Sequence, residues 1–306
     1  MGPVPIEPNP ELREIINRAA HADNALCLTC STCDNECPVN WYSNRLKPRK
    51  IVWMANLGML NELLDLPDLW YCIGCKRCND VCPSLVKPAD LIEFLREEAL
   101  RRKRVTWRSF DEYRCFFSRF QRVRWRAVSR CMKGIDLGAV SEEQWFEWLN
   151  TPIALGAEPI PGKDLFSGSK ELTTLLGRAR GSECFTCSAC TNACPLKGER
   201  AVFDPQWIVR MANLGLEREL LKSPAIWLCI ACGRCTDACS ESVKVHSIIE
   251  RLVNLAVESG TVASGFRRRL NEAYKSLYPR FVRQIDAILG CSDSAGATLP
   301  SSGHSS

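Results

Sequence analysis

The chain has 306 residues, of which 46% are hydrophobic and 25% are charged, and its formal net charge at pH 7 is +5. This balance is typical of a folded protein with room for two domains, and so mild a positive charge does not by itself indicate a nucleic-acid partner. No apolar run approaches the roughly 18 residues that a membrane span needs. The first residues also lack the basic stretch and apolar run of a secretory signal, so we expect neither feature.

Helical patterns dominate the chain from its beginning. Pro10 starts a predicted helix with Asn9 as its N-cap, residues 48–64 form a second predicted helix with apolar side chains at helical spacing, and Pro88 starts another helix. We find no alternating pattern of the kind that strands show. The sequence therefore predicts an all-α fold.

The 19 cysteines carry the strongest pattern in the chain. Sixteen of them fall into four runs with the spacing C-x2-C-x2-C-x3-C, which is the sequence form of a 4Fe–4S cluster held by four thiolates. Without a secretory signal we expect a cytoplasmic, reducing and oxygen-poor compartment, in which cysteines bind metal rather than form disulfides. The sixteen predicted ligands are Cys27, Cys30, Cys33 and Cys37; Cys72, Cys75, Cys78 and Cys82; Cys184, Cys187, Cys190 and Cys194; and Cys229, Cys232, Cys235 and Cys239.

The chain is an internal duplication with an offset of 157 residues between the two halves, because Cys27 corresponds to Cys184 and each later cysteine of the runs follows in step. Residues 54–58 and 211–215 both read Met-Ala-Asn-Leu-Gly. Such self-similarity indicates one structural unit used twice. We predict one unit at residues 8–104 and a second at residues 165–261.

The remaining segments are a linker at residues 105–164, a C-terminal helix at 262–291 and a disordered tail at 292–306. Aromatic and arginine side chains alternate at helical spacing where the linker begins. One interpretation is a helix packed on a repeat, with a solvated arginine face. The other is a docking surface for an acidic partner subunit. The residues concerned are Phe110, Tyr113, Phe117 and Phe120, with Arg114, Arg119, Arg122, Arg124 and Arg126.

A few residues near or outside the runs carry further expectations. Trp70 and Trp227 precede the second run of each half and are expected to pack against a cluster and exclude water. Three cations lie inside cluster loops and are expected to be solvated: Lys76, Arg77 and Arg234. Three cysteines lie outside the runs and are expected to be buried or idle thiols: Cys115, Cys131 and Cys291. The three histidines, His21, His246 and His304, are not expected to be ligands.

Residues 27–38, 49–58 and 69–83 resemble the C subunit of heterodisulfide reductase, and the second half resembles it equally through residues 208–215 and 226–229. The resemblance implies two tandem α-helical ferredoxin domains joined by a helical linker. Similar domains occur in fumarate reductase iron–sulfur subunits and in anaerobic glycerol-3-phosphate dehydrogenase. This chain departs from the family by being duplicated, and by having Ser240 where the other runs end in proline.

The family pattern implies four 4Fe–4S clusters, in which the last cysteine of each run ligates the cluster of the neighbouring run. The resulting groups are Cys27, Cys30, Cys33 and Cys82 (set 1); Cys37, Cys72, Cys75 and Cys78 (set 2); Cys184, Cys187, Cys190 and Cys239 (set 3); and Cys194, Cys229, Cys232 and Cys235 (set 4).

The resemblance implies an electron-transfer subunit of an anaerobic oxidoreductase complex. Such a subunit would relay single electrons between a flavin- or hydrogenase-bearing partner resembling the A subunit and a catalytic partner resembling the B subunit. No catalytic residue and no flavin or nicotinamide motif is evident in this chain. Three alternatives stay open. They are an iron–sulfur subunit of a fumarate reductase-like or glycerol-3-phosphate dehydrogenase-like complex, a thiol/disulfide oxidoreductase in its own right, and a zinc-bearing binding module.

Overall fold

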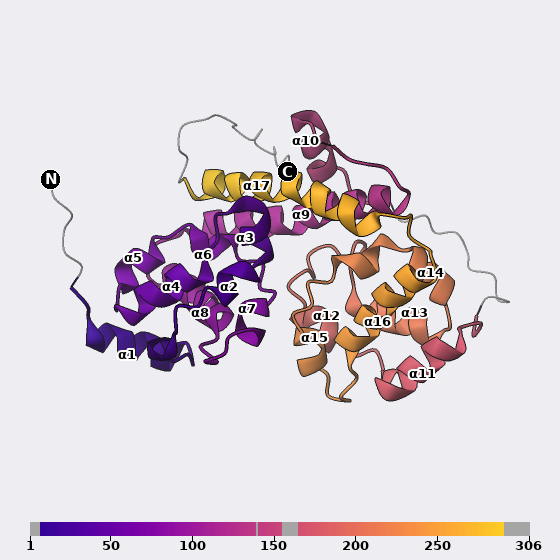
Figure 1. The fold of residues 1–306 in the computed structure, drawn as a ribbon, viewed down its shortest axis with the longest axis horizontal. Coiled ribbons are helices and arrows are strands. Elements are labelled where there is room, and N and C mark those ends of the chain that lie inside the picture. Colours follow the sequence, from indigo (N-terminus) through magenta and orange to yellow (C-terminus); the bar gives the residue numbers. More distant parts are fainter. Residues whose placement is uncertain (1–6, 139, 155–164, 291–306) are drawn as a thin grey trace, which may run out of the picture.

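The computed structural model describes residues 7–138, 140–154 and 165–290. Within these ranges the regular structure is entirely helical, which confirms the all-α prediction. Two bodies of short helices lie side by side, and two long helices run along both of them (Figure 1). In the described part of the chain no helix is long and apolar enough to cross a membrane.

The first body is built around α4 and α8, and the second repeats this plan around α13 and α16 (Figure 1). The helices of the first body are α1 (Pro10–Ala19), η1 (Asn24–Leu26), α2 (Thr32–Asn35), α3 (Pro38–Ser43), α4 (Pro48–Asn56), α5 (Leu60–Leu64), α6 (Asp68–Tyr71), α7 (Arg77–Asp80) and α8 (Pro88–Arg101). Those of the second body are α11 (Lys170–Arg178), η3 (Gly181–Glu183), α12 (Ala189–Ala193), α13 (Pro205–Asn213), α14 (Glu217–Lys222), η4 (Pro224–Leu228), α15 (Arg234–Asp237) and α16 (Val245–Glu258).

Several of these helices begin where the sequence predicts. The Asn9 side chain accepts a hydrogen bond from the Leu12 N–H at 2.9 Å, so Asn9 caps α1 as expected. Pro10, Pro48 and Pro88 each occupy the first position of a helix. Proline suits this position because its fixed backbone angle is helical and the N–H that it lacks would have no partner inside the helix.

The prediction of one helix over residues 48–64 is wrong, because the chain breaks between α4 and α5 at Gly58. Gly58 has a φ of +73°, and a Cβ there would lie 2.1 Å from the backbone oxygen of Asn9. The Asn9 N–H also donates to the Leu57 carbonyl at 2.8 Å. The glycine therefore ends the helix and lets the segment before α1 lie against its end. Gly215, with a φ of +74°, does the same in the second body.

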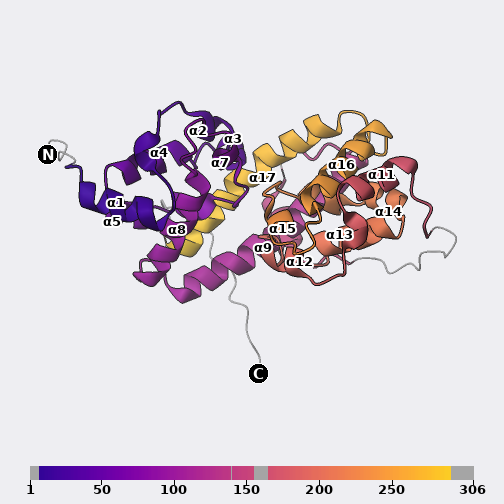
Figure 2. The same cartoon turned by 90° about the horizontal axis from the view of Figure 1, so that it is seen from below.

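The two long helices, α9 (Trp107–Met132) and α17 (Phe266–Leu289), pack against each other in opposite directions (Figure 2). The rings of Phe120 and Phe281 stack where they meet, with centroids 4.6 Å apart. A shorter helix, α10 (Glu142–Asn150), packs on α9.

Each long helix contacts both bodies. At the start of α9, Tyr113 packs on Trp70 of the first body with ring centroids 5.3 Å apart. At its end, the Met132 carbonyl accepts a hydrogen bond from the Ala263 N–H. The last turns of α17 return to the first body, where Asp286 pairs with Arg45 at 3.2 Å. The helices therefore clamp the two bodies together.

The interpretation of a solvated arginine face on α9 is wrong for three of its arginines. Arg122 pairs with Glu199 at 2.5 Å, and Arg124 is only 5% exposed. Arg126 donates to the carbonyl of Trp148, in α10, at 2.9 Å. Arg114 and Arg119 remain exposed. Residues 155–164, the tail at 292–306 and Cys291 lie outside the described residues.

Candidate functional site

Four cavities in the two bodies are each lined by four cysteines, three from one run and the last from the neighbouring run. The structure brings together Cys27, Cys30, Cys33 and Cys82 (set 1); Cys37, Cys72, Cys75 and Cys78 (set 2); Cys184, Cys187, Cys190 and Cys239 (set 3); and Cys194, Cys229, Cys232 and Cys235 (set 4). That these side chains ligate clusters stays a prediction.

The cysteine loops share one backbone conformation. In all four runs, the residues immediately before and after the second cysteine have positive φ angles. Left-handed backbone costs a non-glycine residue roughly 1–2 kcal/mol, and six of these eight positions are not glycine. Such strain persists only where the surroundings fix the chain, as at ligand sites. The eight residues are Thr29, Ser31, Gly74, Lys76, Thr186, Ser188, Ala231 and Gly233.

This backbone aims N–H groups at cysteine sulfurs. The Gly74 N–H lies 3.4 Å from the Cys72 Sγ, and the Ala231 N–H lies 3.4 Å from the Cys229 Sγ. The last cysteines of the second runs, Cys82 and Cys239, likewise accept from the N–H groups four residues later. Hydrogen bonds to the sulfurs are one of the means by which proteins set the potential of an iron–sulfur cluster.

Burial is the main influence on the acidity of the enclosed thiols. It raises the pKa of Cys37 and of Cys194 from 9.0 to about 12, and that of Cys75 to about 11. Cys30 is different, since the hydrogen bond with the Thr32 hydroxyl lowers its pKa. Metal binds thiolates, so a metal entering these cavities must displace protons.

The donors fit a 4Fe–4S group. In the described part of the chain no three His, Cys, Asp or Glu side chains lie close enough to hold a single metal ion. The four cysteines of each set instead surround a cavity whose other walls are largely aliphatic, such as Val52 and Val86 at set 1. Four soft thiolates around one space suit a cubane, which needs one thiolate for each of its irons.

The cavities differ in their access to solvent. Sets 1 and 3 each include an exposed cysteine, Cys30 and Cys187. Beside them the side chains of Leu28 and Phe185 are 69% and 62% exposed. In sets 2 and 4 no cysteine is exposed. We call sets 1 and 3 the outer sets and sets 2 and 4 the inner sets.

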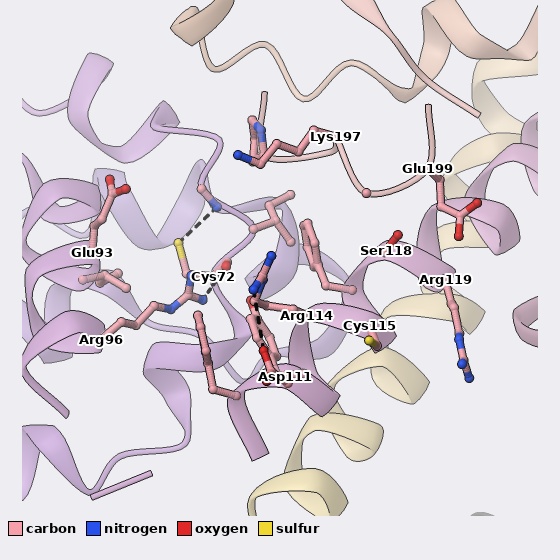
Figure 3. Close-up of a pocket in the computed structure, with 18 of the residues that line it drawn as sticks. Cys72, Glu93, Arg96, Asp111, Arg114, Cys115, Ser118, Arg119, Lys197 and Glu199 are labelled. Carbon is pink, nitrogen blue, oxygen red and sulfur yellow. Dashed lines mark hydrogen bonds and ion pairs between the residues drawn. The ribbon is translucent and has the colours of Figure 1, made fainter. Parts of the chain in front are cut away.

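A groove of about 970 Å³ lies between the two bodies, next to Cys72 of set 2 and to Arg234 from the loop of set 4. Cys72 and Glu93 of the first body, Lys197 and Glu199 of the second body and residues of α9 such as Cys115 line it (Figure 3). Arg234 pairs with Glu93 across the groove at 2.7 Å. The two bodies are thereby joined beside their inner sets.

The expectation that Trp70 and Trp227 pack on a cluster is wrong in the structure, because neither residue lines a cysteine cavity. They anchor the long helices instead. Trp70 contacts Phe110 and Tyr113 of α9, and Trp227 lies 4.4 Å from the Phe266 ring of α17.

The expectation that the loop cations are solvated holds only in part, because all three are half-buried and have partners. Lys76 pairs with Asp90 at 3.6 Å, Arg77 lies over the Trp41 ring, and Arg234 pairs with Glu93. Of the cysteines outside the runs, Cys131 is buried and Cys115 is exposed in the groove.

Sequence reasoning missed one residue near a cavity, His246, which lines the cavity of set 4. Its counterpart in the first body is Ala89, which lines the cavity of set 2. The duplication offset that aligns the cysteines could have placed it there, because it maps His246 onto the first turn of the helix after the second run.

Comparison with known proteins agrees with these cavities. Residues 26–87 and residues 180–243 each match a family model described as a 4Fe–4S dicluster domain. The chain is 34% identical over 97 residues to the C subunit of the H2:CoB-CoM heterodisulfide,ferredoxin reductase of Methanothermobacter thermautotrophicus, covering 31% of this chain and 52% of that protein. It is 34% identical over 116 residues to the C2 subunit of the H2/formate:CoB-CoM heterodisulfide,ferredoxin reductase of Methanococcus maripaludis, covering 38% and 55%.

A protein of Archaeoglobus profundus that is itself similar to the C subunit of heterodisulfide reductase is 32% identical over 88 residues, covering 27% of this chain and 44% of that protein. The chain thus spans about half the length of the relatives that it matches.

Proposed function

We propose that this chain is the electron-relay subunit of an anaerobic redox complex. The premise is that the chain is an iron–sulfur protein similar to the C subunit of heterodisulfide reductase, with two 4Fe–4S dicluster domains. The observation that carries the proposal is the gathering of sixteen cysteines into four sets of four, each around its own cavity. Bound 4Fe–4S clusters would supply one-electron transfer.

In this proposal each set of cysteines holds one cluster, giving four in the chain. The strained loops pre-form the thiolate positions, and backbone N–H groups such as that of Gly74 adjust the charge on the sulfurs. At the inner sets, where no cysteine is exposed, aliphatic walls keep water away from the ligands. No side chain is assigned a catalytic role.

The arrangement of the sets indicates the order of the relay. Cys72 of set 2 and Arg234 from the loop of set 4 both line the groove, whereas the outer sets 1 and 3 include the exposed cysteines Cys30 and Cys187. We therefore infer the order 1, 2, 4, 3, with electrons entering at one outer set and leaving at the other. The long helices keep this order rigid because α9 packs on η4 and on Trp70, and α17 packs on α3 and on Trp227.

The two ends of the relay are the proposed contact points for partner subunits. Large apolar side chains are exposed there, Leu28 and Leu85 beside set 1 and Phe185 beside set 3. Exposed apolar groups of this size often mark interaction sites. By analogy with the relatives, the partners are a flavoprotein resembling the A subunit and a catalytic protein resembling the B subunit. An iron–sulfur subunit of another reductase or dehydrogenase complex would use the same two ends.

The first test is the iron and acid-labile sulfide content of anaerobically purified chain, with EPR spectra of the dithionite-reduced form. About 16 iron and 16 sulfide per chain, from four cubanes, with spin-coupled signals, is the expected result. About 8 iron would contradict the four-cluster proposal, and zinc without sulfide would overturn the whole interpretation.

The grouping of the ligands is tested with Cys37→Ser in the first body and Cys194→Ser in the second. Each variant should perturb an inner cluster and leave the EPR signals of both outer clusters unchanged. Loss of an outer signal instead would show that each run keeps all four of its cysteines for one cluster.

A further inference from the structure

Arg124 is a buried cation in the middle of α9 that lacks an anionic partner in the part of the protein described. Its side chain is 5% exposed, and its Nη1 donates to the Gln121 side-chain oxygen at 2.8 Å. Its Nε has no hydrogen-bond partner, and it forms no ion pair with a described carboxylate. Burying a charge costs several kcal/mol unless an opposite charge offsets it. The compensation for Arg124 must therefore come from something besides a carboxylate.

The surroundings of Arg124 connect the two inner sets. On one side, α9 packs against η4, the short helix that leads directly into Cys229 of set 4. On the other side, the guanidinium lies 5.8 Å from the ring centre of Tyr274. That ring contacts Tyr42 of α3, the helix that begins immediately after Cys37 of set 2.

The tyrosine rings continue from Arg124 toward set 2. The Tyr274 ring packs on Tyr278 with ring centres 5.5 Å apart, and Tyr278 stacks on Tyr42 with ring centres 5.2 Å apart. Tyr42 lies in α3, which begins directly after Cys37. Arg124 therefore adjoins elements that lead to both inner sets.

We propose that Arg124 is the shared buried counter-cation of the two inner clusters, and that it raises their reduction potentials above those they would otherwise have. A cubane with four thiolate ligands is anionic, and reduction adds another negative charge, which a nearby buried cation favours. The anionic clusters would in turn stabilise the buried guanidinium, with the Tyr274 ring adding a cation–π contact. The inference rests on the proposed function, because it requires clusters in sets 2 and 4.

The test is an EPR-monitored redox titration of the full chain with its clusters in place. Arg124→Met should shift the inner clusters toward lower potential, changing their oxidised-to-reduced ratio at a fixed potential about tenfold, which is about 59 mV for a one-electron couple. The cluster of set 4 should move most, because α9 packs directly against η4, which leads into Cys229, whereas the rings of Tyr274 and Tyr42 separate Arg124 from set 2. Arg124→Lys retains the positive charge and should keep the reduction potentials of the inner clusters close to the wild-type values. The outer clusters should not move.

Arg269→Met is the matched control. Arg269 is also a buried arginine of the long-helix pair, with 7% exposure, but it donates to the carbonyl oxygens of Cys131 and Ala263, which lie outside the four cysteine runs. The Arg269→Met variant should leave the reduction potentials of all four clusters unchanged. An equal shift in this control would show a general response to loss of a buried arginine and would overturn the proposal.

A second variant covers the case in which Arg124→Met does not fold. Gln121→Glu nearly preserves the side-chain shape and places a carboxylate 2.8 Å from the Arg124 Nη1, so it should offset the cation without removing it. The reduction potentials of the clusters of sets 2 and 4 should then fall, as they should in Arg124→Met. If the wild type carries fewer than four clusters, the proposed function fails first. If it carries four and neither variant moves an inner potential, only the role of Arg124 is disproved.

Discussion

The two bodies have the same cysteine loops but stabilise them with different side chains. In the first body, Asp34 from a cysteine loop accepts from the Arg49 N–H at the start of α4 at 2.8 Å, and pairs with the Arg49 side chain. In the second, Asp204 caps α13 from within its own segment and also accepts from the Thr191 hydroxyl. A carboxylate therefore lies at the start of α4 and of α13, but it comes from α2 in the first body and from the residue just before α13 in the second.

This comparison shows which features of the cysteine loops the two bodies share and which features differ between them. Left-handed residues occur at matching positions, such as Ser31 and Ser188, although their neighbours differ. The surrounding charges are not matched, because Asp34 faces Arg49, whereas Asp204 forms no ion pair within the described chain. The loop backbone therefore sets where thiolates lie, and the variable side chains set the field that they experience. The predictions below test this division.

The largest effect is expected at the contact that joins the two bodies. Phe281→Ala removes a fully buried ring that stacks on Phe116 and Phe120, and should cost about 3–5 kcal/mol of unfolding free energy. Calorimetry of the holoprotein should then resolve two transitions in place of one, because the bodies lose their shared clamp. Phe185→Ala, at an exposed ring, is the control and should change stability by less than about 0.5 kcal/mol. A single unshifted transition in Phe281→Ala would show that the clamp contributes little.

The next effect concerns the glycine that follows α4 in the first body and α13 in the second. Gly58→Ala places a Cβ against the Asn9 carbonyl and keeps a left-handed backbone, so it should destabilise the chain by roughly 3 kcal/mol. Gly215→Ala should destabilise the chain by a similar amount. Thermal unfolding of both variants measures the loss.

Gly260→Ala separates the two causes of that effect. Gly260 also has a positive φ, of +66°, but a Cβ there would meet nothing within 4 Å. It should therefore cost only the backbone term, about 1–2 kcal/mol. Equal losses at Gly58 and Gly260 would mean that the approach of the Asn9 segment is not tight.

A reciprocal exchange tests the unequal charges near the outer sets. Gln206 in the second body stands where the first has Arg49. Gln206→Arg should raise the potential of the outer cluster of set 3, and Arg49→Gln should lower that of set 1. Each shift should stay below about tenfold in oxidised-to-reduced ratio, or about 59 mV, because Arg49 is 43% exposed and its charge is screened. Redox titration followed by EPR measures both. Shifts in the same direction would contradict the charge argument.

Much of the fold was predictable because it depends on local rules. Prolines at helix starts, the Asn9 cap and the absence of alternating patterns are all sequence-local, and the structure confirms them. The two dicluster domains also follow from cysteine spacing alone.

Other features depend on contacts that the sequence does not show. Thr29 and Ser31 adopt left-handed backbone although neither residue type favours it, so no glycine signal was available. The arginine pattern of α9 indicated a solvated face, but α10 and the second body cover Arg122 and Arg126. The helix break at Gly58 depends on the approach of Asn9, which lies 49 residues earlier in the chain.

The smallest effect is expected at Ser240, where the fourth run departs from the proline of the other three. The two turns are alike, since the Ser242 N–H donates to the Cys239 carbonyl at 3.1 Å, as the Leu85 N–H does to Cys82. The Val243 N–H also reaches the Cys239 Sγ at the same 3.4 Å as its counterpart. Ser240→Pro should therefore leave the iron content unchanged and alter stability by less than about 0.5 kcal/mol. A lower iron content in Ser240→Pro than in the wild type, measured beside Pro83→Ser as the reverse exchange, would show that the two turns differ after all. The cysteine positions would then depend on the residue that follows each run, and the loop backbone would no longer be the sole determinant of where the thiolates lie.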